Sequence, residues 1–325
     1  MGSAVEADSA NPYGISAMQL QRYLYMIDQA DRAENARQNA VPIAPTAATF
    51  TIVNQDGVGE GFNDTSPRSS EGGNFATTLG GQRLAVFERA AQIWGVALDS
   101  TTATRIEAKF DPLTPCSASG GVLGSAGPLG INRDFPGAPF NNTFYPSALA
   151  NKLRGLDLSA GNEISATFNS SVGVGSCLTG TRFYLGLDAL TPANTINLLV
   201  VVLHEIGHGV GSLSFANQDG SFAGDFPDAW SRLMFDRTQN LSWFAMTNAQ
   251  RASSSTNIGN LGWSGANVRA GAGFLTAGRD AEGRVRLFAP SPFQGGSSVS
   301  HFDTVNSPNL LMEPSINTGL PLTLD

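Results

Sequence analysis

The sequence predicts an α+β fold in which helices pack on a twisted, mixed sheet. A strand–helix–strand pattern covers residues 50–113, and a second, strongly apolar helix is expected at 194–211. About the last third of the chain is rich in glycine and serine and shows little periodicity, so we expect it to be mostly loop. We therefore expect an N-terminal subdomain over 46–211 and a loop-rich C-terminal subdomain over 212–325.

Each regular element of the N-terminal subdomain has its own pattern. Residues 50–55 and 105–113 alternate between apolar and polar residues, as half-buried strands do. Between them, 81–98 predicts a helix with one apolar stripe. Two strands separated by one helix favour a parallel pair with a right-handed crossover. Shorter strands are expected at 163–168 and 182–187, and a short helix at 227–236 in the C-terminal region.

Residues 1–45 stand ahead of this fold. Their apolar residues follow helical spacing over 15–37, and a linker rich in alanine and proline comes next. We expect a packed accessory helix, with a pro-segment remnant as the alternative. The first residues, up to Tyr13, lack the basic cluster and apolar stretch of a signal peptide.

Composition narrows the possible partners. Nineteen basic against 27 acidic side chains give a net charge of −8, which disfavours binding to nucleic acid or to an anionic membrane. No apolar run reaches the ~18 residues of a membrane span. The oligomeric state stays open at this point.

The two cysteines, Cys116 and Cys177, lie in Gly/Ser-rich sequence. This setting favours a disulfide over two buried thiols. A bridge closing a loop of about 60 residues would stabilise the fold by roughly 4 kcal/mol. Disulfides persist in oxidising compartments, so the sequence predicts an exported protein.

The segment His204-Glu205-Ile206-Gly207-His208 carries the chemistry. The chain has three histidines, and two of them form this HExxH motif inside the apolar helix. Residues i and i+4 share a helix face, so both imidazoles can bind one metal ion, with Glu205 beside it as a general base. The expected chance frequency at this composition is roughly one in a thousand, so the motif is specific. Two core histidines with a glutamate are the alternative, but burying them without partners would be costly.

A catalytic zinc takes three protein ligands and keeps one position open. The longer motif HExxHxxGxxH requires a glycine at 211, which is present, and a third histidine at 214, where this chain has Ser214. His301 is the remaining histidine and therefore the best candidate. The alternatives are carboxylates that follow the helix: Asp219, Asp225, Asp228, Glu282 and Glu313.

With HExxHxxG at 204–211 and His301 followed by NLLMEP, the chain resembles the metzincin zinc endopeptidases. It is most similar to those like leishmanolysin, in which a long insertion precedes the third histidine. The resemblance implies His204, His208 and His301 as zinc ligands and Glu205 as the general base. It also implies Gly211 as the turn after the helix and Met312 as the methionine of a Met-turn beneath the metal. The matching motifs lie at 195–211 and 297–317. Over 46–194 the resemblance concerns only the expected architecture, and residues 1–45 lie outside it.

Weaker signals come with their alternatives. The resemblance makes 182–188 a candidate edge strand for substrate, although an ordinary core strand fits equally. It also makes 313–319 a wall of the pocket for the residue after the scissile bond. Asp303 is either a partner of His301 or a solvated loop residue. Asp56, Glu60 and Asp64 could bind a calcium ion, and the alternative is that this segment is a Gly-rich turn without a metal.

The sequence therefore predicts a secreted zinc endopeptidase that acts on protein or peptide substrates. Two alternatives stay open. One is a zincin-fold module that binds proteins without cleaving them. The other is a processing protease dedicated to one substrate.

Overall fold

The computed structural model describes residues 47–316, so the helix expected at 15–37 lies outside the described residues. The main sheet has four strands in the order β1-β2-β6-β3. Strands β1, β2 and β6 are parallel, and β3 is antiparallel at one edge, which confirms the predicted mixed sheet. The strands are β1 Thr49–Asn54, β2 Ala103–Asp111, β6 Ile164–Asn169 and β3 Gly124–Pro128.

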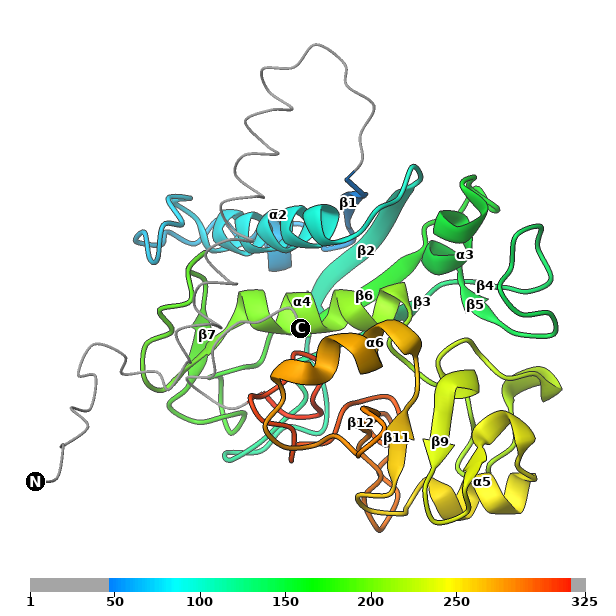
Figure 1. Ribbon diagram of the computed structural model, residues 1–325. Helices are drawn as coiled ribbons and strands as arrows, with labels where there is room; N and C mark the ends of the chain where they lie inside the picture. Colours follow the sequence, from blue (N-terminus) through cyan, green and yellow to red (C-terminus); the bar gives the residue numbers. More distant parts are fainter. Residues whose placement is uncertain (1–46, 317–325) are drawn as a thin grey trace, which may run out of the picture.

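Two long helices cover one face of this sheet. Helix α2 (Leu79–Ala97) lies against β1, and helix α4 (Leu198–Val210) lies against β3 and β6. Figure 1 shows α2 above α4 with the strands behind them. Both helices begin at a side-chain cap, Thr78 for α2 and Asn197 for α4, which accepts a backbone N–H of the first turn. The helices predicted at 81–98 and 194–211 and the parallel strand pair are confirmed.

The core between the helices and the sheet is built from alternate strand residues. Phe110 on β2 and Phe168 on β6 are buried and meet Phe87 of α2, with ring centroids 4.7–5.9 Å apart. Phe62, from the turn that follows β1, closes this cluster edge-to-face. Such pairs add about 0.5–1.5 kcal/mol each beyond the area they bury. The aromatic cluster therefore holds α2 against β2 and β6.

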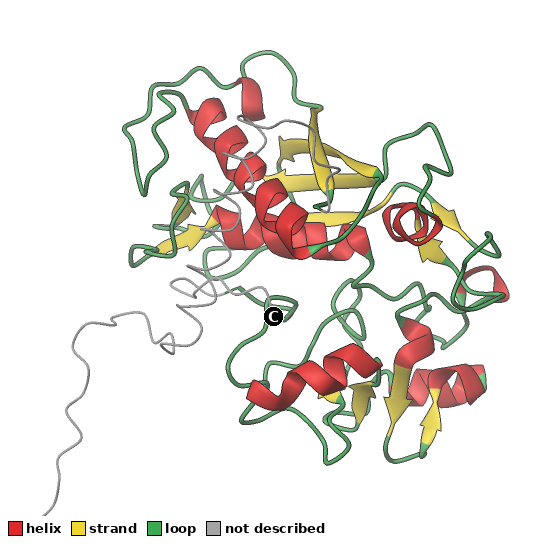
Figure 2. Cartoon of the chain, turned by 45° about the horizontal axis from the view of Figure 1, so that its top comes forward, coloured by secondary structure: helices red, strands yellow, loops and turns green. Residues whose placement is uncertain are grey.

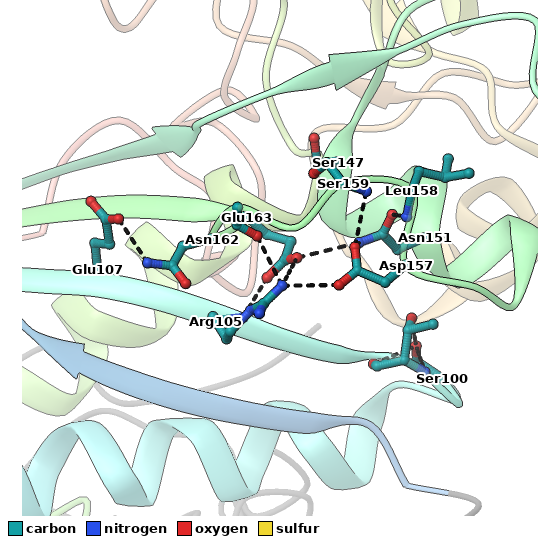
Figure 3. Close-up of polar contacts among 12 residues, drawn as sticks. Ser100, Arg105, Glu107, Ser147, Asn151, Asp157, Leu158, Ser159, Asn162 and Glu163 are labelled. Carbon is teal, nitrogen blue, oxygen red and sulfur yellow. Dashed lines mark hydrogen bonds and ion pairs between the residues drawn. The ribbon is translucent and has the colours of Figure 1, made fainter.

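A cluster of polar side chains lies at the end of the sheet where β2 begins (Figure 3). The Arg105 guanidinium donates to Asp157 at 2.9 Å and to Glu163 at 3.3 Å, and the Arg105 amide donates to Glu163 at 2.7 Å. Asn151, on helix α3 (Ser147–Arg154), donates to the same two carboxylates. These bonds join α3 and the start of β6 to β2, and so set where β6 and its neighbour β3 lie.

The segment 114–180 contains elements that the sequence pattern did not predict. Besides β3, it forms α3 and the short strands β4 (Ile131–Asn132) and β5 (Tyr145–Pro146), which pair with each other. Cys116 and Cys177 form the predicted disulfide, with their Cα atoms 5.0 Å apart. The bridge joins the loop that precedes β3 to the loop that follows β6.

The region after α4 is mostly loop around a second small sheet, as Figure 2 shows. Its strand order is β10-β9-β11-β12, and all pairs are antiparallel. The strands are β9 Met234–Asp236, β10 Leu241–Ser242, β11 Leu261–Trp263 and β12 Val285–Arg286, and the helices are α5 Asn248–Ser254 and α6 Ala266–Gly271. The division of the chain at residue 211 stays a prediction.

The prediction of a helix at 227–236 is wrong. A single 3₁₀ turn, Ser231–Leu233, leads directly into β9. The Asp228 carboxylate accepts the Ser231 amide at 2.7 Å, and Asp236 accepts the amides of Thr238 and Gln239. These local side-chain bonds compete with a helical ladder and explain the difference.

The segment 182–188 and the described helices bear on the expected edge strand and on a membrane span. The segment expected to form an edge strand at 182–188 lies outside the main sheet, because β7 (Arg182–Tyr184) pairs in parallel with β8 (Thr195–Asn197) as a separate ladder. The edge strands of the main sheet are β1 and β3, and β3 is the one that α4 packs against. Among residues 47–316, no helix has the length and apolar character needed to cross a membrane.

Candidate metal centre

Helix α4 presents two imidazoles on one face. His204 and His208 are one turn apart, and both are buried. The helix can be this apolar because it is covered on all sides, with Leu199 and Leu203 also fully buried in the core. The histidines are therefore held by a rigid element.

The helix ends at Gly211, as the sequence predicted. Gly211 has φ of +133°, a conformation that favours glycine, and its amide bonds back to the carbonyl of His208. The turn brings the Ser212 carbonyl to the His208 ring, where it accepts from Nδ1 at 2.7 Å. The glycine turn thus orients the second histidine.

His301 reaches the two helix histidines from a loop 93 residues further along the chain than His208. The three Nε2 atoms form a triangle with sides of 3.0, 3.1 and 3.2 Å. Within residues 47–316, these three side chains are the group of His, Cys, Asp or Glu residues that could hold a metal ion.

Each Nδ1 atom of the triad faces a backbone carbonyl. His204 meets the Leu311 carbonyl at 2.7 Å, and His301 meets the Ser297 carbonyl at 2.8 Å. Because a carbonyl can only accept, we assign the proton of each neutral ring to Nδ1. The three Nε2 lone pairs then converge at about 3 Å, which is unfavourable unless a cation lies between them.

Burial keeps the rings neutral. It lowers the pKa of His204 well below its usual value, lowers that of His208, and brings that of His301 to about 3. Neutral imidazole is the form that binds metal.

The donor set fits zinc. Two nitrogen ligands at zinc distances of ~2.0–2.1 Å and a tetrahedral angle lie about 3.3 Å apart, close to the sides of the triangle. Three imidazoles without a fourth side chain are also the donor set of catalytic rather than structural zinc sites.

Glu205 lies between α4 and the edge strand β3. Its carboxylate accepts the Ala126 amide, and a Cβ placed on Gly124 would lie 2.9 Å from Glu205 Cγ. Burial raises the pKa of Glu205 to about 8, while the Ala126 bond opposes that rise. Burial without a nearby cation thus disfavours the charged form of this carboxyl.

The outer edge of β3 passes this carboxylate. Asn169 on β6 donates to the Leu123 carbonyl, and Leu129 donates to Glu163. In an antiparallel ladder alternate residues bond to the partner, so the odd-numbered residues of β3 face β6. Gly124 and Ala126 therefore direct their carbonyls away from β6, beside Glu205. No strand among the described residues pairs with this edge.

Met312 packs beneath the helix. It is buried, and its Sδ atom is 2.5 Å from the position that a Cβ on Gly207 would take. The turn that carries Met312 also supplies the Leu311 carbonyl that orients His204. Glycine at position 207 is what permits this close approach.

The rival ligands lie elsewhere. Asp228 is buried, but its carboxylate accepts the amides of Phe215 and Ser231. Asp219 accepts from Ser221. Asp225, Glu282 and Glu313 also lie outside the triad, and Glu313 accepts the Leu310 amide. The prediction of His301 as the third member of the group is thus confirmed, while its metal ligation stays a proposal.

Two weaker site predictions find no support. Asp303 accepts the Val305 amide, and the ring of His301 bonds to the Ser297 carbonyl instead. At the proposed calcium site, Asp56 accepts the amides of Phe62 and Phe110, and Glu60 and Asp64 also accept backbone amides. These bonds favour the alternative of a Gly-rich turn.

The sequence did not indicate β3 or the carbonyl acceptors. A strand of Gly-Ser-Ala-Gly-Pro has no apolar alternation, although its proline suits an edge strand. The acceptors for the histidines are backbone atoms, which any residue type provides. Two surface cavities, of about 330 and 740 Å³, lie on α2 near Leu187 and along 273–281, and neither includes a triad histidine.

Comparison with known proteins identifies no relative. No protein-family model, no curated protein and no solved structure matches the chain. Any functional conclusion must come from the residues of the site.

Proposed function

We propose that the protein is a secreted zinc-dependent endopeptidase of metzincin type. The convergence of three bare Nε2 atoms at 3.0–3.2 Å is the observation that supports this proposal most strongly. His204, His208 and His301 would hold the metal. A zinc ion bound there supplies a Lewis acid that polarises a carbonyl and lowers the pKa of water.

In this proposal Glu205 moves the proton. It takes one from the attacking water and delivers it to the leaving amine of the cleaved bond. A glutamate directly after the first histidine of HExxH is the group expected to exchange this proton. The Ala126 amide orients the carboxylate while it does so.

The outer edge of β3 is the proposed site for the substrate backbone. An extended peptide would add there as a further strand, bonding to the Gly124 amide and to the carbonyls of Gly124 and Ala126, while the Ala126 amide stays bonded to Glu205. This assignment replaces the segment 182–188, which lies in a separate ladder. It also places the peptide beside the Glu205 carboxylate.

The disulfide supports secretion, since such bridges persist mainly outside the reducing cytosol. The substrate class, a protein or peptide, follows from the metzincin resemblance. The alternatives are a zincin-fold module that binds proteins without cleaving them and a protease dedicated to one substrate.

Casein hydrolysis with zinc analysis tests the proposal. The parent chain should cleave casein and contain about one zinc ion. Glu205→Gln keeps an oxygen for the Ala126 amide, and should retain the zinc and lose at least ~100-fold of the activity. The Glu205→Ala variant should do the same.

Each other outcome has a definite meaning. Retained turnover in the Glu205 variants would refute the mechanism. Zinc in every sample with no cleavage would favour the binding module or the dedicated protease. No zinc in the parent would refute the metal assignment.

A further inference from the structure

We propose that Trp230 is a positioning residue for the third metal ligand. In this inference its indole N–H holds the Val299 carbonyl and thereby fixes His301 against the two histidines of α4. The inference rests on the metal site proposed above. It also assigns a role to part of the long segment between His208 and His301.

His301 depends on its loop in a way that the other two histidines do not. His204 and His208 belong to α4, whereas His301 is carried by the segment 294–301, called here the third-ligand loop. The His301 ring bonds to Ser297 of the same loop, and Ser298 bonds to Gln294. These internal bonds shape the loop but do not place it relative to α4.

Val299 has a backbone conformation that requires external support. Its φ is +62°, in the left-handed region that β-branched residues rarely adopt. The side chain is buried, at 2 % exposed. The Val299 carbonyl accepts the Trp230 indole N–H at 2.8 Å. This bond favours the left-handed conformation two residues before the proposed ligand.

Trp230 is itself held rigidly. It is buried and stacks on Trp263, with ring centroids 4.9 Å apart, and Trp263 donates its own N–H to the Trp230 carbonyl at 3.1 Å. On another side its ring packs against the ring of Phe302, the residue after His301, with the ring centroids 5.7 Å apart. Asp228, two residues earlier, is fixed by the amides of Phe215 and Ser231. A rigid donor of this kind can fix a loop.

A second bond reaches the same loop from the same part of the chain. The Ser214 amide donates to the Ser300 hydroxyl at 3.1 Å, and the Ser214 hydroxyl lies 2.6 Å from that of Ser231. Position 214 thus contributes a bond to the loop that carries the third histidine. These two anchors come from residues that follow α4 within 20 positions. Phe288 adds a backbone anchor, because its amide donates to the His301 carbonyl at 2.9 Å and its carbonyl accepts the Val299 amide at 2.8 Å.

The test is the zinc dissociation constant, measured by competition with a chelator. Trp230→Phe keeps an aromatic ring and removes the N–H, and should raise the constant about tenfold, as the loss of one buried hydrogen bond would. The matched control is Trp243→Phe. Trp243 is also buried and donates its N–H to Ser254 at 2.9 Å, away from the third-ligand loop. This control should stay within about twofold of the parent.

Rescue separates positioning from general packing. Glycine populates positive φ readily, so in a Val299→Gly background the bond from Trp230 is no longer needed. The double variant should bind zinc within about twofold of Val299→Gly alone. The visible spectrum of the cobalt-substituted protein should change in Trp230→Phe and be restored in the double variant.

Several outcomes would overturn the inference. Equal zinc affinity in Trp230→Phe and Trp243→Phe would do so, and so would an undiminished effect in the glycine background. If Trp230→Phe does not fold, Ser300→Ala carries the test and should weaken zinc binding about threefold, and parent-like affinity would then refute the anchoring. A parent that binds no zinc would instead refute the proposed function.

Discussion

The contact between Gly124 and Glu205 yields a sharp test of the proposed proton transfer. Gly124→Ala would place a Cβ 2.9 Å from Glu205 Cγ and 3.0 Å from Oε1, whereas ordinary contacts start at 3.4 Å. The carboxylate must therefore retreat by about 0.4–0.5 Å. A 1 Å misplacement in an active site can cost ~100-fold in rate, so this shift should lower kcat about tenfold.

Gly127→Ala is the matched control. It lies in the same strand, and a Cβ there would meet no atom within 4 Å. Neither glycine has a positive φ, so both variants should fold with similar stability. The assay is peptide hydrolysis per zinc-loaded molecule, with zinc content expected to be unchanged in both. Equal kcat in the two variants would refute the placement of Glu205 against β3.

Two further predictions concern stability. Burial raises the pKa of Glu313 from 4.5 to about 7, so as pH rises the unfolded chain ionises this carboxyl first. The free energy of unfolding should therefore fall by up to about 3 kcal/mol between pH 5 and pH 8. Glu313→Gln should abolish this pH-dependent part of the free energy of unfolding, as measured by denaturant titration at each pH. An unchanged pH dependence would contradict the burial argument. Removing the zinc with a chelator should lower the melting temperature by roughly 10 °C. The reference is the protein at a zinc concentration ~1,000-fold above Kd. In His301→Ala most of this shift should disappear, and a chelator effect equal to that on the parent would exclude His301 as a ligand.

Local sequence was enough for the parts of the fold in which neighbours decide the structure. The helices at 79–97 and 198–210 follow from apolar spacing with a cap at each start, and their observed bounds agree with the pattern within a few residues. His204 and His208 could be paired from sequence because four residues along a helix return to the same face. The composition around Cys116 and Cys177 likewise favoured the disulfide that the structure contains.

Prediction failed where backbone atoms or distant segments decide. At 227–236 a helix was predicted, but the Asp228 carboxylate bonds to the local backbone and the chain forms a turn and a strand. Strand β3 lacks apolar alternation because it is built of small residues and proline. It is a strand because β6 supplies its hydrogen-bond partners. The segment 182–188 has a clear strand pattern, yet pairing placed it in another ladder.

The sequence by itself determined that two imidazoles and a carboxylate share one helix, because helical spacing depends only on residues a few positions apart. It also narrowed the third histidine to His301, since no other remained. Only the tertiary structure decided that the three Nε2 atoms converge, that Leu311 and Ser297 orient two of the rings, and that Trp230 holds the third-ligand loop. These contacts join residues 4 to 107 positions apart, several through backbone carbonyls that every residue carries. Such contacts cannot be predicted from a residue pattern, because the packing of the whole chain brings the atoms together.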